Sequence, residues 1–171
     1  MYSQKEVMDF IKEENVGSIR LTFCDIFGNA KNISIMSSEI ERAFCDGISF
    51  DSSAIRGFTG EERSDLFLHP DPKTLSILPW GPEHSRVIRM FCDIKNPDGS
   101  PYPHDSRHIL KEAVKTAQDA GIHCNFGPEY EFYLFRTNEN GESNHEPFDH
   151  AGYMDIAPED RCENIRREIC F

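Results

Sequence analysis

Short segments in which apolar and polar residues alternate dominate the first hundred residues of the chain. Five such segments, with one or two short helical patterns between them, predict strands, and the clearest lie at residues 18–24, 30–35, 75–78 and 86–94. A turn that contains glycine joins the first two, which predicts a hairpin. Because short strands with few intervening helices favour a mixed sheet, we expect a compact α+β fold.

Apolar residues at helical spacing predict helices over residues 3–14, 37–45 and 106–120, and from a point after Pro158 onward. We expect Ser106 to cap the third helix. The last pattern has no cap or stop signal, which predicts that the sequence is a piece of a longer chain.

Three prolines and a glycine interrupt every pattern between residues 95 and 105. This composition is typical of a linker. We therefore expect a domain boundary here, with a first domain over residues 1–102 and a second over residues 103–171.

The composition narrows the classes of partner. The 171 residues carry a formal net charge of −12, which argues against nucleic acid or an anionic membrane surface as the main partner. No apolar run approaches the ~20 residues of a membrane span, and the N-terminus lacks the pattern of a secretion signal, so we expect a cytoplasmic protein. The six cysteines form no C-x-x-C pair, which predicts reduced thiols.

Two acids stand inside an aromatic run, N-F-G-P-E-Y-E-F-Y-L-F, at residues 125–135. Its period-two alternation predicts a strand with Glu129 and Glu131 on one face, about 6.6–7 Å apart along it. Carboxylate oxygens suit Mg²⁺ or Mn²⁺, so one interpretation is a metal site on a strand. The alternative is a solvent-facing side whose acids pair with lysine or arginine.

A loop at residues 47–60 holds three glycines, four hydroxyl side chains and the single acid Asp51. Such a loop can be functional, but Asp51 and Ser53 can also cap a turn without any further role. The sequence has no Gly-rich phosphate loop and no serine nucleophile elbow. The histidines in the second half, at positions 123, 145 and 150, lack metal-ligand spacing and are expected at the surface.

Five blocks of sequence carry a resemblance to one family. They are F-D-S-S-A-I-R-G-F at 50–58, S-D-L-F-L-H-P-D-P at 64–72, C-D-I-K-N-P-D-G at 92–99, G-P-E-Y-E-F-Y-L-F at 127–135 and G-Y-M-D-I-A-P at 152–158. In this order and spacing they resemble bacterial type I glutamine synthetase. The resemblance extends over nearly the whole chain.

The resemblance implies a β-grasp-like domain followed by only the opening part of a catalytic domain. The activity it implies is ligation of ammonia to L-glutamate with ATP as co-substrate, through γ-glutamyl phosphate, in a homo-oligomer whose active sites lie between subunits. Glu129 and Glu131 match the positions that hold the family's Mg²⁺ or Mn²⁺ ions. Asp51 matches the acid that binds ammonium and assists its deprotonation, Ser53 lies beside it, and Asp65 matches a further acid of the same segment.

The chain departs from the family pattern F-D-G-S-S-I, because Ser52 replaces the glycine and Ala54 the second serine. Ser106 also stands where a proline is usual. Ser52 would be strained only if its backbone needed a positive φ.

The isolated chain is expected to be inactive, because the blocks for the other metal ligands, ATP and glutamate are missing. Two alternatives to a glutamine synthetase remain open. The chain could be a non-catalytic binding or assembly module that keeps the β-grasp interface. A metal hydrolase with two carboxylates remains open only if the resemblance is accidental.

Overall fold

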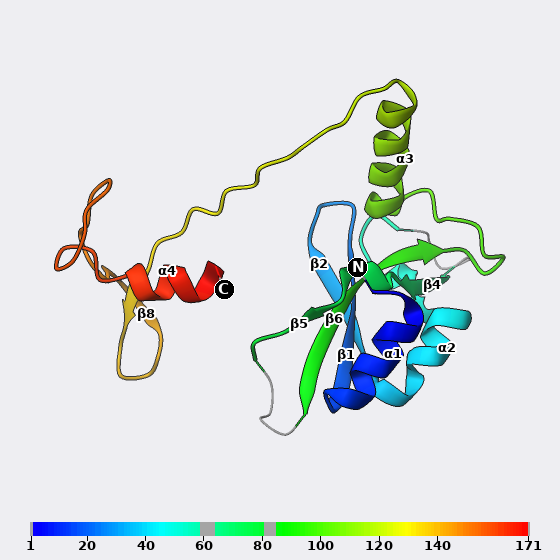
Figure 1. Cartoon of the computed structure of the whole chain (residues 1–171), viewed down its shortest axis with the longest axis horizontal. Coiled ribbons are helices and arrows are strands. Elements are labelled where there is room, and N and C mark those ends of the chain that lie inside the picture. The colour runs from blue at the N-terminus through cyan, green and yellow to red at the C-terminus, as the bar shows by residue number, and fades with distance from the viewer. Residues whose placement is uncertain (1, 59–63, 81–84, 171) are drawn as a thin grey trace. The chain divides into compact units, whose positions relative to one another are not determined.

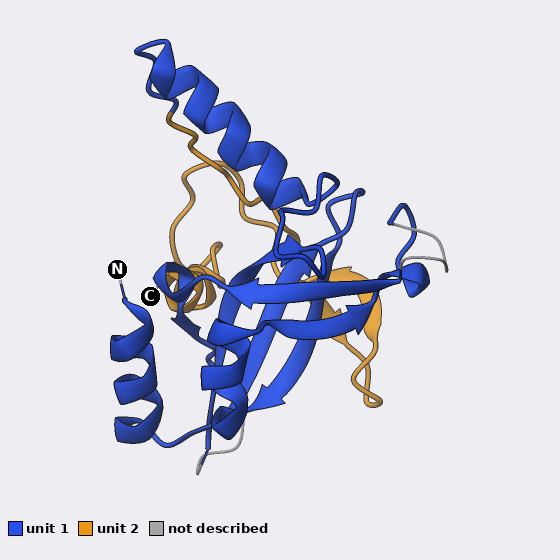
Figure 2. Ribbon diagram, turned by 90° about the vertical axis from the view of Figure 1, so that its right-hand side faces the viewer, with its two compact units in different colours: residues 1–124 blue, residues 125–171 orange. Residues whose placement is uncertain are grey.

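The computed structural model describes residues 2–58, 64–80 and 85–170. Contacts divide the chain into two compact units, residues 1–124 and 125–171, drawn in blue and orange in Figure 2.

A mixed sheet organises the first unit (Figure 1). Its strands are β1 (Val16–Cys24), β2 (Ala30–Met36), β3 (Ile48–Asp51), β4 (Asp65–Pro70), β5 (Ser76–Ile77) and β6 (Arg86–Lys95). The order across the sheet is β2-β1-β6-β4-β3, and β5 pairs with β6 beside this path. Strands β1 and β6 run parallel, whereas the other pairs are antiparallel. This architecture confirms the predicted α+β class and the predicted hairpin.

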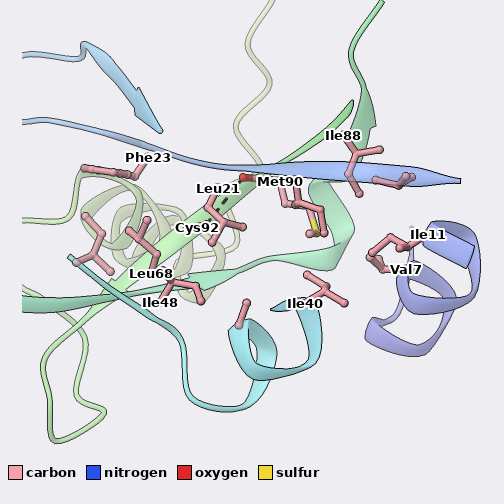
Figure 3. Close-up of a cluster of buried hydrophobic side chains, with 14 of the residues drawn as sticks. Val7, Ile11, Leu21, Phe23, Ile40, Ile48, Leu68, Ile88, Met90 and Cys92 are labelled. Carbon is pink, nitrogen blue, oxygen red and sulfur yellow. Dashed lines mark hydrogen bonds between the residues drawn. The ribbon is translucent and has the colours of Figure 1, made fainter. Parts of the chain in front are cut away.

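The alternation in β6 explains how the sheet forms a core. Ile88, Met90, Cys92 and Ile94 are buried, and the residues between them are partly exposed. Successive side chains of a strand point to opposite faces, so these four share one face. Figure 3 shows the first three among the buried side chains contributed by the neighbouring strands.

Two helices contribute to the same core. Helix α1 (Gln4–Glu13) buries Val7 and Ile11, and helix α2 (Ile40–Cys45) buries Ile40 and Ala43 (Figure 3). The described residues also form three short helical turns of the 3₁₀ type, Ser37–Glu39, Ser52–Ala54 and Pro72–Thr74. Burial of these apolar side chains supplies the main favourable free energy of folding.

The start of α1 was readable from the sequence. The Ser3 hydroxyl accepts from the amide of Glu6, and the Glu6 carboxylate accepts from the amide of Ser3 at 2.7 Å. This reciprocal pair is a capping box.

Helix α3 (Ser106–Asp119) is capped by Asp105, so the prediction that Ser106 is the cap is wrong. One Asp105 oxygen accepts from the amide of Arg107, and the other accepts from the amide of Ile94 in β6, both at 3.1 Å. The carboxylate therefore satisfies a helix end and an amide of the sheet together, which a serine hydroxyl cannot do. Gly121, with φ +74°, follows the end of the helix.

The second unit holds a small hairpin and a helix. Strands β7 (Phe135–Thr137) and β8 (Ser143–Pro147) pair antiparallel, and α4 spans Glu163–Cys170. Residues 125–134 are extended but form no strand, so the strand predicted from Glu129 to Phe135 is wrong except at Phe135. None of residues 125–134 belongs to a paired ladder, and a strand exists only as part of one.

None of the described helices combines the length and the apolar character needed to span a membrane. All six cysteines are free, and two of them, Cys92 and Cys162, are buried. The three histidines at positions 123, 145 and 150 are exposed, as predicted.

Candidate functional site

Asp51 and Asp65 face each other across two strands. Asp51 is the last residue of β3 and Asp65 the first residue of β4, and the antiparallel register pairs them directly. The α-carbons of such a pair lie about 4.5–5.5 Å apart. Both residues are exposed. Like charges at directly opposed positions repel each other, so a cation would be favoured beside them.

The carboxylate of Asp51 is held by Ser53. Its Oδ1 atom accepts from the Ser53 hydroxyl at 2.6 Å and from the Ser53 amide at 2.9 Å. These two hydrogen bonds hold the pKa of Asp51 below its ordinary value, and the one from the hydroxyl has the larger effect. Asp51 thus caps the 3₁₀ turn Ser52–Ala54, which confirms the capping interpretation without excluding a site.

The same local geometry also occurs at Asp98, away from β3 and β4. Asp98 Oδ1 accepts from the Ser100 hydroxyl at 2.6 Å and from its amide at 2.9 Å. The turn alone therefore does not mark a site. What distinguishes Asp51 is the second carboxylate, Asp65, opposite it.

The loop around Asp51 is anchored at its base. Ser52 is fully buried, and its amide donates to the carbonyl of Ser64 at 2.7 Å. Ser52 is not among the described residues with positive φ, so the replacement of glycine there introduces no backbone strain. Ala54 is exposed. The last two residues of the predicted loop, 59 and 60, lie outside the described residues.

Glu129 and Glu131 lie in the extended segment of the second unit, and both are exposed. Glu131 lines a hollow of about 840 Å³, together with Tyr130, Phe132 and residues that precede α4. Glu129 is not among the residues that line this hollow. Oxygen ligands from one extended segment can bind a divalent cation, but Mg²⁺ takes six ligands, so these two carboxylates make only part of a site.

Three further side chains of the second unit gather in a way that sequence reasoning missed. Potential ligand atoms of Asp149, Asp160 and Cys162 lie within 4.8 Å of one another. Each is already used, because the thiol donates to Asp149 at 3.3 Å and Asp160 pairs with Arg166. Burial, followed by the two carboxylates, raises the pKa of the Cys162 thiol, which disfavours the thiolate that metals bind. These hydrogen bonds and the ion pair therefore stabilise the start of α4.

The structure brings Asp51, Ser53 and Asp65 together at one end of the β3–β4 pair. Glu129 and Glu131 belong to the other unit. The roles of all five residues stay predictions.

Two family models match the chain in succession. The model for the β-grasp domain of glutamine synthetase matches residues 15–97, and the model for its catalytic domain matches residues 103–171. The fold in the first range is therefore the β-grasp that the resemblance implied.

Curated relatives and solved structures agree. A glutamine synthetase from Clostridium saccharobutylicum is 43% identical over 168 residues, and one from Methanosarcina mazei is 42% identical over 169 residues. These matches cover 98% and 99% of this chain but only 38% of each relative, so the chain spans less than half of their length.

Among solved structures, the glutamine synthetase of Plasmodium falciparum matches with a TM-score of 0.72 over 99% of this chain and 39% of that chain, at 22% identity. A structure described as apo GmaS without ligand matches with a TM-score of 0.62 over 68% of this chain and 27% of that chain, also at 22% identity. These two likenesses show the fold alone. The family models, together with relatives above 40% identity, show that the chain belongs to the glutamine synthetase family.

Proposed function

We propose that this chain is the N-terminal part of a ligase that uses ATP to join ammonia to L-glutamate, forming L-glutamine through γ-glutamyl phosphate. One observation carries the proposal: the β-grasp model and the catalytic-domain model match successive parts of this chain, and its relatives are named glutamine synthetase. Because the chain spans 38% of those relatives, we expect the 171 residues alone to be inactive.

In this proposal Asp51 binds ammonium. The opposed carboxylate of Asp65 adds negative charge beside it, and the two hydrogen bonds from Ser53 keep Asp51 ionised. Ammonium must lose a proton before its nitrogen can attack an acyl phosphate. A carboxylate can attract the cation and then accept that proton, which leaves ammonia with a free electron pair.

Glu129 and Glu131 would supply oxygen ligands to Mg²⁺ or Mn²⁺. The donor set fits, since both side chains are exposed carboxylates at alternate positions of one extended segment. Their part is to hold the ion from one side and leave its other positions open. A bound divalent cation neutralises charge on the phosphates of ATP.

The unit boundary and the family boundary differ. The family models change between residues 97 and 103, whereas the compact units divide after Cys124, because Asp105 and Lys111 tie α3 to β6. We propose domains at residues 1–102 and 103–171. We further propose a cytoplasmic homo-oligomer in which the Asp51 loop completes the active site of a neighbouring subunit.

The proposal is tested with the full-length product of the reading frame that contains this sequence. Glutamine formation should require ATP, ammonium and glutamate, and Glu131→Gln should lower it by about a hundredfold or more, as expected when a group that stabilises the transition state is lost. Glu139→Gln is the matched control, since Glu139 is also an exposed acid of the second unit, and it should leave the rate unchanged. A full-length protein that forms no glutamine would refute the ligase and favour the non-catalytic binding or assembly module. Turnover by the 171 residues alone would refute their predicted inactivity.

A further inference from the structure

The tip of the β1–β2 hairpin, residues 25–29, lies against the loop that carries Asp51. A β-carbon placed on Gly57 would be 2.1 Å from the Cδ1 atom of Ile26, so the Ile26 side chain packs directly on the Gly57 backbone. Beside it, the guanidinium carbon of Arg56 lies 5.1 Å from the centre of the Phe27 ring. This distance is that of a cation–π contact.

The hairpin tip is itself rigid. Asp25 is 4% exposed, and its Oδ1 atom accepts from the amides of Phe27 and Asn29, both at 2.9 Å. The Asn29 side chain donates to the other oxygen at 3.0 Å. A buried carboxylate with several donors fixes the backbone around it. The two residues at the tip therefore meet the loop from a fixed direction.

The apolar side chains at the tip have no role in the core. Ile26 is 46% exposed and Phe27 is 56% exposed, and neither belongs to the buried cluster of the first unit. On the loop side, Ile26 packs on Gly57 and the Phe27 ring lies against Arg56. The chain therefore places two large apolar residues at a solvent-exposed turn, where they meet the Asp51 loop.

Two successive turns connect this contact to Asp51. The amide of Phe58 donates to the carbonyl of Ile55 at 3.1 Å, and the amide of Ile55 donates to the carbonyl of Ser52 at 3.0 Å. Inside the loop, the Phe58 ring contacts the Tyr102 ring in a tilted arrangement, with the two ring centres 5.3 Å apart. The loop is thus held by aromatic rings on its inner side and by the hairpin tip on its outer side.

We propose that the hairpin tip is a positioning element for the Asp51 loop, and that Ile26 and Phe27 are its contact residues. By fixing Arg56 and Gly57, the tip keeps Ser53 in place to donate both hydrogen bonds to Asp51. Neither residue touches a substrate. The catalytic meaning of this element rests on the proposed function, whereas the ordering of the loop does not.

The ordering is tested in the 171-residue chain without any turnover. The double variant Ile26→Ala/Phe27→Ala should speed hydrogen exchange at the amides of Ser53, Ile55 and Phe58 by about tenfold, since a cation–π contact and an apolar contact are lost together. Ile77→Ala is the matched control, because Ile77 is also 46% exposed but lies on β5. Exchange equal to that of the control would overturn the proposal.

Two readouts separate positioning from general loosening. The variant Phe27→Tyr keeps the aromatic ring, so the loop amides should exchange as fast as in the unchanged chain. The variant Phe27→Leu loses the ring, so the same amides should exchange faster. In the double variant the pKa of Asp51, measured by NMR titration, should rise toward its ordinary value. An unchanged pKa together with faster exchange would show that the tip does not control the Asp51–Ser53 hydrogen bonds, and would overturn the positioning role.

The full-length protein tests the catalytic meaning. The double variant should raise the KM for ammonium by about tenfold and leave the KM for ATP unchanged. An unchanged KM for ammonium would overturn the link to catalysis. If the unaltered full-length protein forms no glutamine, the proposed function fails, and the exchange and pKa results still decide whether the tip orders the loop.

Discussion

Replacing Asp105 by alanine should destabilise the first unit by about 2–4 kcal/mol, because this carboxylate serves two elements. Loss of a helix cap costs about 1 kcal/mol, and leaving the Ile94 amide without its acceptor costs about 1–3 kcal/mol more. Asp105 is 1% exposed, and burial raises its pKa. Removing a buried charge offsets part of the loss, which places the expected value toward the lower end.

Urea unfolding followed by circular dichroism measures this free energy, and hydrogen exchange at the Ile94 amide locates it. Asp98→Ala is the matched control, because Asp98 also accepts from a backbone amide but is exposed and accepts within its own turn. We expect the control to unfold at nearly the same urea concentration as the unchanged chain. If Asp105→Ala is as stable as the control, or if exchange at Ile94 is unchanged, the argument that one carboxylate joins α3 to β6 is wrong.

Three further outcomes follow from pKa values and burial. Ser53→Ala should raise the pKa of Asp51 in an NMR titration, since the Ser53 hydroxyl is the largest cause of its lowering, and an unchanged value would contradict the hydrogen bond. The folded-state pKa of Asp105 is raised, so its stabilising contribution is fully present below the unfolded-state pKa and is lost as pH rises through the folded-state pKa. Between these two pKa values the unchanged chain should therefore lose stability relative to Asp105→Asn. Parallel curves of unfolding free energy against pH for the two chains would refute this. Cys92 is buried and desolvation raises its thiol pKa, whereas Cys124 is exposed, so a thiol reagent should label Cys124 first in the folded chain, and equal rates would contradict the described burial.

The parts of the fold that sequence predicted best are those whose signals are local. The capping box of Ser3 and Glu6 lies within four residues, and the alternation of β6 directly gives the face that is buried. The β1–β2 hairpin needs only two adjacent strands and a turn. In each case the residues that determine the structure are the ones that carry the pattern.

The features that sequence reasoning missed depend on contacts between distant residues. Asp105 and Ser106 are both good helix caps by residue type, and the choice of Asp105 is favoured by a bond to Ile94, eleven residues earlier. Likewise, the opposition of Asp51 and Asp65 comes from the register of β3 against β4. Each acid was predicted separately, from its match to a family motif, and only the pairing of strands shows that they share one place.

The extended segment at residues 125–134 shows the limit of a periodic pattern. Alternation predicts which side chains share a face of a strand, but it does not supply the neighbouring strand that Glu129 and Glu131 would need. Phe126 is 84% exposed, Tyr130 90% and Tyr133 86%, so these aromatic residues have no covering layer among the described residues. A sheet fixes both the direction of a side chain and its distance from the next strand. The metal prediction requires both, and the sequence pattern carries only the first.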